Sequence, residues 1–151
     1  MVEYNISATS KRVLSFVIDD IVVGIFLLII FYDQITQLGI QASKVDMDPL
    51  KVQELINAFI ISATPIVVAI KVLYHSLLVW QNGMTIGKYI AKIKVVDIKS
   101  GNKPTFAQAL FRGSMRLVSE VVFYIGFLLA FVSDKRQTFH DKVSNCVVVD
   151  V

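Results

Sequence analysis

Five ionisable residues interrupt long runs of apolar residues in this sequence. They are Asp19, Asp20, Lys71, His75 and Glu120. At the centre of a membrane-spanning helix, a charged side chain costs about 2.5–3.5 kcal/mol on insertion scales, so such residues face other helices or a polar cavity. Adjacent carboxylates disfavour each other's ionisation, and a site of low dielectric strengthens this effect. Asp19, Asp20 and Glu120 are therefore our candidates for binding a cation or exchanging protons.

The basic candidates are spaced so that they can partner these acids. Arg12 precedes Asp19 by seven residues, which places it two helical turns and about 10 Å away on the same face. Lys71 and His75 are four residues apart and share a face of their own helix. We expect Arg12, Lys71 and His75 to be charge partners of the acids. An alternative stays open, in which the pairs only fix helix packing and register.

The elements that hold these residues are predicted to be membrane spans. The apolar runs 13–31, 55–80 and 117–132 approach the roughly 20 residues that a bilayer core requires. Hydrophobic residues make up 55% of the chain and charged residues 18%, against about 25% charged in a soluble domain. We expect an all-α membrane protein with about three transmembrane helices in a single domain, residues 1–151. The first run is too long for a signal peptide and contains two acids.

Charge asymmetry predicts the orientation of these spans. The connection 33–54 is mainly acidic, whereas segment 81–116 carries seven basic residues and one acid. The positive-inside rule places segment 81–116 and the N-terminus in the cytoplasm. The inner mouth of the proposed site would then comprise Lys88, Arg112, Arg116, His140 and Asp141.

The C-terminal tail conflicts with three full spans. Its apolar run 146–149 reads as a strand whose natural partner is 93–98, and pairing requires both strands on the cytoplasmic side. One solution is that the third span is a re-entrant hairpin, with a turn near Ser119 and Glu120. We therefore expect a small two-stranded cytoplasmic β element and both termini inside. Residues 105–116 are predicted to form an amphipathic interfacial helix, whose arginines could bind lipid phosphate.

Other motifs do not support catalysis. Residues 83–88 read GMTIGK, which has one residue too few between its glycines for a phosphate loop and Tyr89 in place of Ser or Thr. His140 and Asp141 form a dyad, but the second histidine lies inside a predicted span. Cys146 is the single cysteine. We expect no catalytic residues, no metal site, no cofactor and no nucleic-acid partner, and so not an enzyme.

Taken in order, several motifs resemble the RDD family of membrane proteins, named for one arginine and two aspartates. They are Arg12, Ile18-Asp19-Asp20, the 83–88 element, residues 93–97, Gly101, Phe106, Arg112, residues 135–141 and residues 146–149. The match extends from about Ser7 to Val149. It departs at Asn145-Cys146, where the family usually has glycine or alanine followed by threonine. The resemblance makes Arg12, Asp19 and Asp20 the namesake positions.

The resemblance implies a multi-pass protein of the bacterial inner membrane, and some family members are associated with sodium/proton antiport. The expected function is a small, homo-oligomeric transporter for a monovalent cation or proton that uses intramembrane aspartates. The alternative is a non-catalytic scaffold that binds a partner protein or anionic lipid headgroups of the bilayer through its basic cytoplasmic face.

Overall fold

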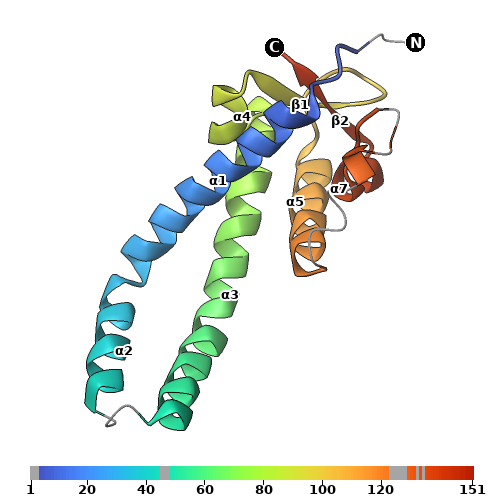
Figure 1. Cartoon of the computed structure of the whole chain (residues 1–151). Coiled ribbons are helices and arrows are strands. Elements are labelled where there is room, and N and C mark those ends of the chain that lie inside the picture. Colours follow the sequence, from blue (N-terminus) through green and yellow to red (C-terminus); the bar gives the residue numbers. More distant parts are fainter. Residues whose placement is uncertain (1–3, 45–47, 123–128, 132, 134) are drawn as a thin grey trace.

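Two long antiparallel helices dominate the computed structural model, which describes residues 4–44, 48–122, 129–131, 133 and 135–151 (Figure 1). They are α1 (Thr9–Ile30) and α3 (Pro49–Asn82). Both are long and apolar enough to cross a membrane. α1 covers the predicted span 13–31 as far as Ile30, and α3 contains the predicted span 55–80.

The distribution of side chains on α1 is the reverse of that on a helix of a soluble protein. Its buried residues are Ser15, Asp19 and Val23, which recur every four positions and form one stripe. Large apolar side chains such as Ile21 and Leu28 are instead exposed. A helix in water hides its apolar face, so this pattern is typical of a helix whose outer face is solvated by lipid.

The connection between the two long helices is itself helical. α2 (Tyr32–Lys44) follows α1 after Phe31 and has no buried residue. Phe31 contacts Phe59 of α3 edge to face, with 5.8 Å between ring centroids. α3 has 34 residues and is therefore about 51 Å long, which exceeds the roughly 30 Å hydrocarbon core. The predicted 55–80 span is thus the central part of a longer helix, which continues through Pro65.

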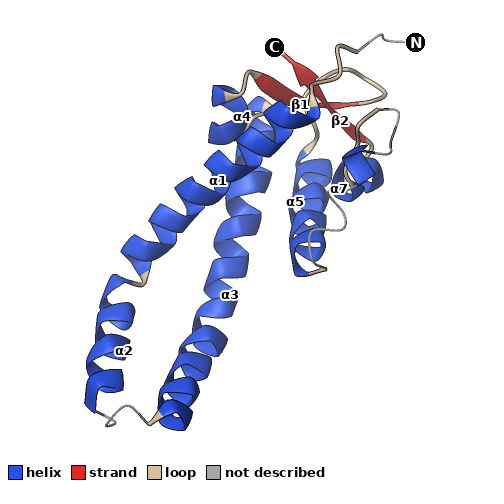
Figure 2. Cartoon of the chain, viewed as in Figure 1, coloured by secondary structure: helices blue, strands red, loops and turns tan. Residues whose placement is uncertain are grey.

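The predicted strand pair is confirmed. β1 (Ile93–Asp97) and β2 (Cys146–Asp150) form a two-stranded antiparallel sheet near both chain ends (Figure 2). The register pairs Val95 with Val148. One face of the sheet packs with Val79 of α3 and Ala109 in a buried apolar cluster. The sheet therefore joins the end of α3 to the C-terminal segment.

α5 (Phe106–Val121) corrects two expectations about its region. Its arginines Arg112 and Arg116 are buried among other charged residues, rather than lying on an exposed face toward lipid phosphate. The helix also continues through Ser119 and Glu120 and ends at Val121, so the turn expected near these two residues begins only at Val122. The rest of the predicted third span includes residues 123–128 and 132, which lie outside the described residues.

Close packing explains why α5 can reach the charges on α3. A Cβ at Gly113 would lie 2.4 Å from Ser76 Oγ, so glycine lets the two helices approach without displacing the Ser76 side chain. Two short helices complete the charged end: α4 (Ile86–Ile90), which contacts α1, and α7 (Phe139–Val143), which contacts α5. Thr138 and Asp141 form a capping box at the start of α7.

Candidate functional site

Asp19 is a fully buried carboxylate that is surrounded by donors. It accepts hydrogen bonds from Tyr74 Oη at 2.8 Å, Thr85 Oγ1 at 2.6 Å and the backbone N–H of Gly87 at 2.8 Å. Lys88 Nζ lies 3.7 Å from its second oxygen. These hydrogen bonds replace the hydration that burial of the carboxyl group removes.

The 83–88 segment that resembles a phosphate loop is built around this carboxylate. Gly83 ends α3 in the left-handed conformation, with φ at 72°. Thr85 then begins α4 and turns its hydroxyl to Asp19. A Cβ at Gly87 would lie 2.1 Å from the carbonyl oxygen of Ser15, so α4 touches the α1 backbone directly. The glycines and threonine of this motif thus bind the chain's own aspartate.

A second group of charges links three helices. Arg116 of α5 contacts Asp20 of α1 at 3.4 Å and Glu120 at 3.1 Å. Glu120 in turn binds Lys71 of α3 at 2.7 Å. The result is an alternating chain, Asp20–Arg116–Glu120–Lys71, in which every charge has a neighbour of opposite sign.

Two aromatic rings border this chain of charges. The guanidinium of Arg116 lies over the ring of Phe16, 4.8 Å from its centroid. Its Nη1 atom is 3.5 Å from Nδ1 of the buried His75. A cation over the face of an aromatic ring is attracted by the ring's quadrupole, and this attraction is stronger where water is excluded. Arg116 is therefore held from several sides at the meeting point of α1, α3 and α5.

Asp141 forms the third group. Its Oδ1 atom accepts from Arg112 Nε at 2.8 Å and lies 2.6 Å from Arg112 Nη2. Arg12 Nη1 lies 3.5 Å from Oδ2. Burial alone would raise the pKa of Asp141, but the charges of Arg112 and Arg12 and the hydrogen bond from Arg112 outweigh it and hold that pKa below its ordinary value. Asp141 is therefore ionised at neutral pH.

Arg12 connects this group to the N-terminal segment and the sheet. It donates to Ser7 Oγ at 2.9 Å, to the carbonyl of Val148 at 2.9 Å, and to the carbonyl of Arg136. A planar guanidinium has five N–H donors and can satisfy several acceptors at once. Arg12 thus fixes the first turn of α1 against β2 and α7.

Two buried bases in this region have lowered pKa values. Burial, and repulsion by Arg112 and Arg116, lower the pKa of Lys88 to about 7, although Asp19 opposes the shift. Burial also lowers the pKa of His140 well below its ordinary value, although Asp141 at 3.9 Å opposes this. His140 is therefore neutral at neutral pH, and Lys88 loses its proton far more readily than an exposed lysine does.

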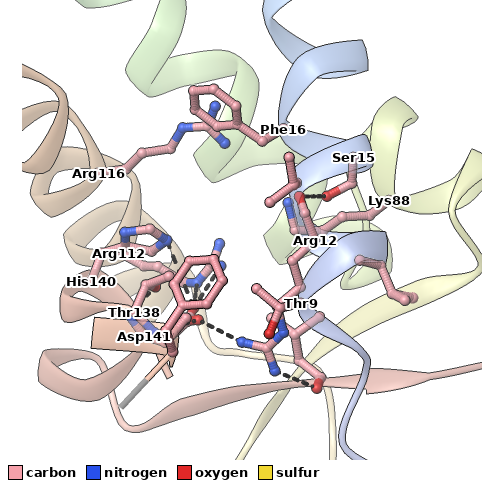
Figure 3. A pocket seen from close by; sticks show the side chains of 15 residues that line it. Thr9, Arg12, Ser15, Phe16, Lys88, Arg112, Arg116, Thr138, His140 and Asp141 are labelled. Atoms are coloured by element: carbon pink, nitrogen blue, oxygen red, sulfur yellow. Dashed lines mark hydrogen bonds and ion pairs between the residues drawn. The ribbon is translucent and has the colours of Figure 1, made fainter. Parts of the chain in front are cut away.

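A cavity of about 170 Å³ opens among these residues (Figure 3). Its charged lining comprises Arg12, Lys88, Arg112, Arg116 and Asp141. Apolar side chains complete it, including Val13 and Phe16 of α1 and Ala130 and Phe131. Most of the cavity surface is thus apolar, and most of the charged side chains that line it are basic.

The structure brings together the residues that we selected from the sequence, but not all of their partnerships are the expected ones. Lys71 pairs with Glu120, one of the three acids for which it was expected as a partner, whereas Arg12 pairs with Asp141, which was not among those acids. Sequence reasoning missed Tyr74, whose hydroxyl donates to Asp19. It also missed the roles of Thr85 and Gly87, although their motif was the available signal.

The comparisons with known proteins agree with the resemblance drawn from the motifs. The model of the RDD family matches residues 6–145. The Bacillus subtilis uncharacterized protein YxaI is 30% identical over 144 residues, which cover 91% of this chain and 93% of that protein. No solved structure matches the chain.

Two further relatives share a shorter segment. An uncharacterized protein of Rickettsia prowazekii is 30% identical over 70 residues, covering 46% of this chain and 38% of that protein. A proline-rich antigen homolog of Mycobacterium tuberculosis is 32% identical over 69 residues, covering 46% of this chain and 29% of that protein. The matched segment thus spans about a third of each of these longer relatives.

Proposed function

The chain belongs to the RDD family, and from this premise we propose that it is a multi-pass protein of the cell membrane that carries protons or a monovalent cation. The observation that carries the proposal is the charge chain Asp20–Arg116–Glu120–Lys71. It connects two helices of span length through α5. Intramembrane ionisable residues are by default candidates for ion or proton pathways.

The depth of these charges supports the proposal. Asp20 lies eleven residues from the start of α1, and Lys71 lies eleven residues from the end of α3. At 1.5 Å per residue, each is about 17 Å from the same end of the helix pair. That depth is about half of a 30 Å hydrocarbon core. The charge chain then forms one layer within the membrane rather than a set of unrelated surface contacts.

The two aspartates receive different roles in the proposal. Both oxygens of Asp19 are occupied by donors, which leaves it suited to holding α4 against α1. Asp20 makes a longer contact, and its side chain is 31% exposed. The exchanging carboxylates are therefore Asp20 and Glu120, with Arg116 and Lys71 as their countercharges. The N-terminus is proposed to be cytoplasmic, and several copies would assemble, since two span-length helices are few for a closed pathway.

The test is ion-coupled proton flux in proteoliposomes that contain a trapped pH-sensitive dye. Addition of external NaCl or KCl should change the internal pH for the wild type. Asp20→Asn combined with Glu120→Gln should reduce the rate at least tenfold. Asp33→Asn, which removes an exposed acid from α2, is the matched control. Absence of flux in the wild type, or equal flux in a folded double variant, would refute the proposal.

A scaffold function is the second candidate, because three lysines remain exposed near the sheet. They are Lys92, Lys99 and Lys103. Such residues suit an acidic partner or an anionic lipid surface. A scaffold predicts no flux in the same vesicles. It also predicts that substitution of these lysines, rather than of the buried charges, abolishes binding.

A further inference from the structure

The cavity beside the first turns of α1 has an unusual balance of charge. Four cationic side chains line it, and among the described lining residues Asp141 is the one carboxylate. The wider ionic network links these groups to Lys71, Asp19, Asp20 and Glu120. Among the residues that the structure describes, this network contains five basic side chains and four carboxylates, so it is not rich in acid. A ligand that enters this cavity is therefore expected to be an anion.

The walls and the size of the cavity restrict the ligand further. The volume of about 170 Å³ is several times the roughly 30 Å³ that one water molecule occupies in the liquid. Phe16, Phe131 and Ala130 present apolar surface beside the cations. A small oxyanion carrying an apolar body matches both the cationic and the apolar parts of this lining.

The position of the cavity points to phosphate. Arg12 lies three residues into α1, about 5 Å from the start of that span-length helix. Phospholipid phosphates lie at this level of a bilayer, and basic pockets between helices bind such headgroups. Arginine is also the side chain best suited to phosphate, because its planar N–H groups match the oxyanion geometry.

We propose that this cavity is a binding site for a phosphate group, with Arg12 and Lys88 facing the oxyanion and Phe16 and Phe131 facing its apolar body. The site goes beyond the proposed transport function and does not depend on it. A protein with no ion flux would still bind the phosphate, and a transporter could lack the site. The same chemistry is available from a phospholipid or from free phosphate.

The experiment measures thermal stability of the purified protein in maltoside detergent with three additions. They are phosphatidylglycerol, inorganic phosphate and an equal ionic strength of chloride. Wild-type protein should be stabilised by phosphatidylglycerol at micromolar concentration and not by chloride. Stabilisation by inorganic phosphate as well would support the site and assign free phosphate as a ligand. Stabilisation by neither phosphate source would overturn the proposal.

Two variants test whether the effect arises in this cavity. Lys88→Met removes a lining cation but leaves Asp19 its three hydrogen bonds. Ala130→Leu keeps every charge and fills the cavity from its apolar wall. Each should weaken phosphatidylglycerol binding about tenfold, whereas Lys99→Met, which removes an exposed lysine, should not. If both folded variants bind as the wild type does, the lipid is bound elsewhere and the proposal fails.

Discussion

The carboxylate of Asp19 accepts a hydrogen bond from the backbone N–H of Gly87, 68 residues away, at 2.8 Å. This contact joins Asp19 of α1 to the glycine-containing element, residues 83–88, that follows α3. It needs no ligand, because the first turn of α4 offers its N–H group to a carboxylate of the same chain. A helix N-terminus favours such an anion. The glycine-containing element is thus a docking site for α1.

This contact predicts a large effect of a single methyl group. Gly87→Ala would place a Cβ 2.1 Å from the carbonyl oxygen of Ser15, where backbone atoms cannot move aside without separating α4 from α1. Overpacking of this kind costs about 1–3 kcal/mol or more. We expect a clear fall in thermal unfolding temperature in detergent. Gly24→Ala on α1 is the matched control, since nothing lies within 4 Å of its added Cβ. Equal stability of both variants would contradict the packing described here.

The two neighbouring aspartates are predicted to respond differently to the same substitution. Asp19→Asn replaces an oxygen that accepts hydrogen bonds with an NH2 group, which cannot accept them from the surrounding donors. It also leaves buried Lys88 without its countercharge. Breaking a buried pair in this way costs about 3–5 kcal/mol. Asp20→Asn should lower the free energy of unfolding much less, because Asp20 is partly exposed and Arg116 retains its ion pair with Glu120. Chemical unfolding of the two variants in the same detergent measures the difference, and equal losses would refute the assignment of roles.

Binding of phosphatidylglycerol is predicted to weaken as pH rises through about 7. Burial lowers the pKa of Lys88 to about 7, and a bound anion would raise it again, so binding above pH 7 requires proton uptake. Affinity should be nearly constant below pH 6 and fall by up to tenfold per pH unit above 7. The charged or titratable groups that act on Lys88 or feel its charge are Asp19, His75, Arg112, Arg116, His140 and Asp141.

The measurement is a lipid titration at pH 6, 7 and 8, with phosphatidylglycerol chosen because its diester phosphate does not titrate in this range. In Lys88→Met the remaining affinity should not depend on pH. A pH dependence that persists in this variant would show that another group, and not Lys88, takes up the proton.

The amino-acid sequence by itself determined the long helices, the strand pair and the set of charged residues. Apolar runs of sufficient length and the β-rich segments near 93–97 and 146–150 are local properties, which follow from hydropathy and residue type. The burial cost of a charge likewise requires only that Asp19, Asp20, Lys71 and Glu120 find partners. It does not say which partners those are.

Which charged residue pairs with which was decided by the tertiary structure alone. Glycines at 87 and 113 let α4 and α5 approach α1 and α3 so closely that Thr85 reaches Asp19 and Arg116 reaches Asp20. Such contacts span 66 and 96 residues of sequence. Electrostatic energy depends on the distance between charges in space, and that distance is set by how helices pack rather than by their spacing along the chain.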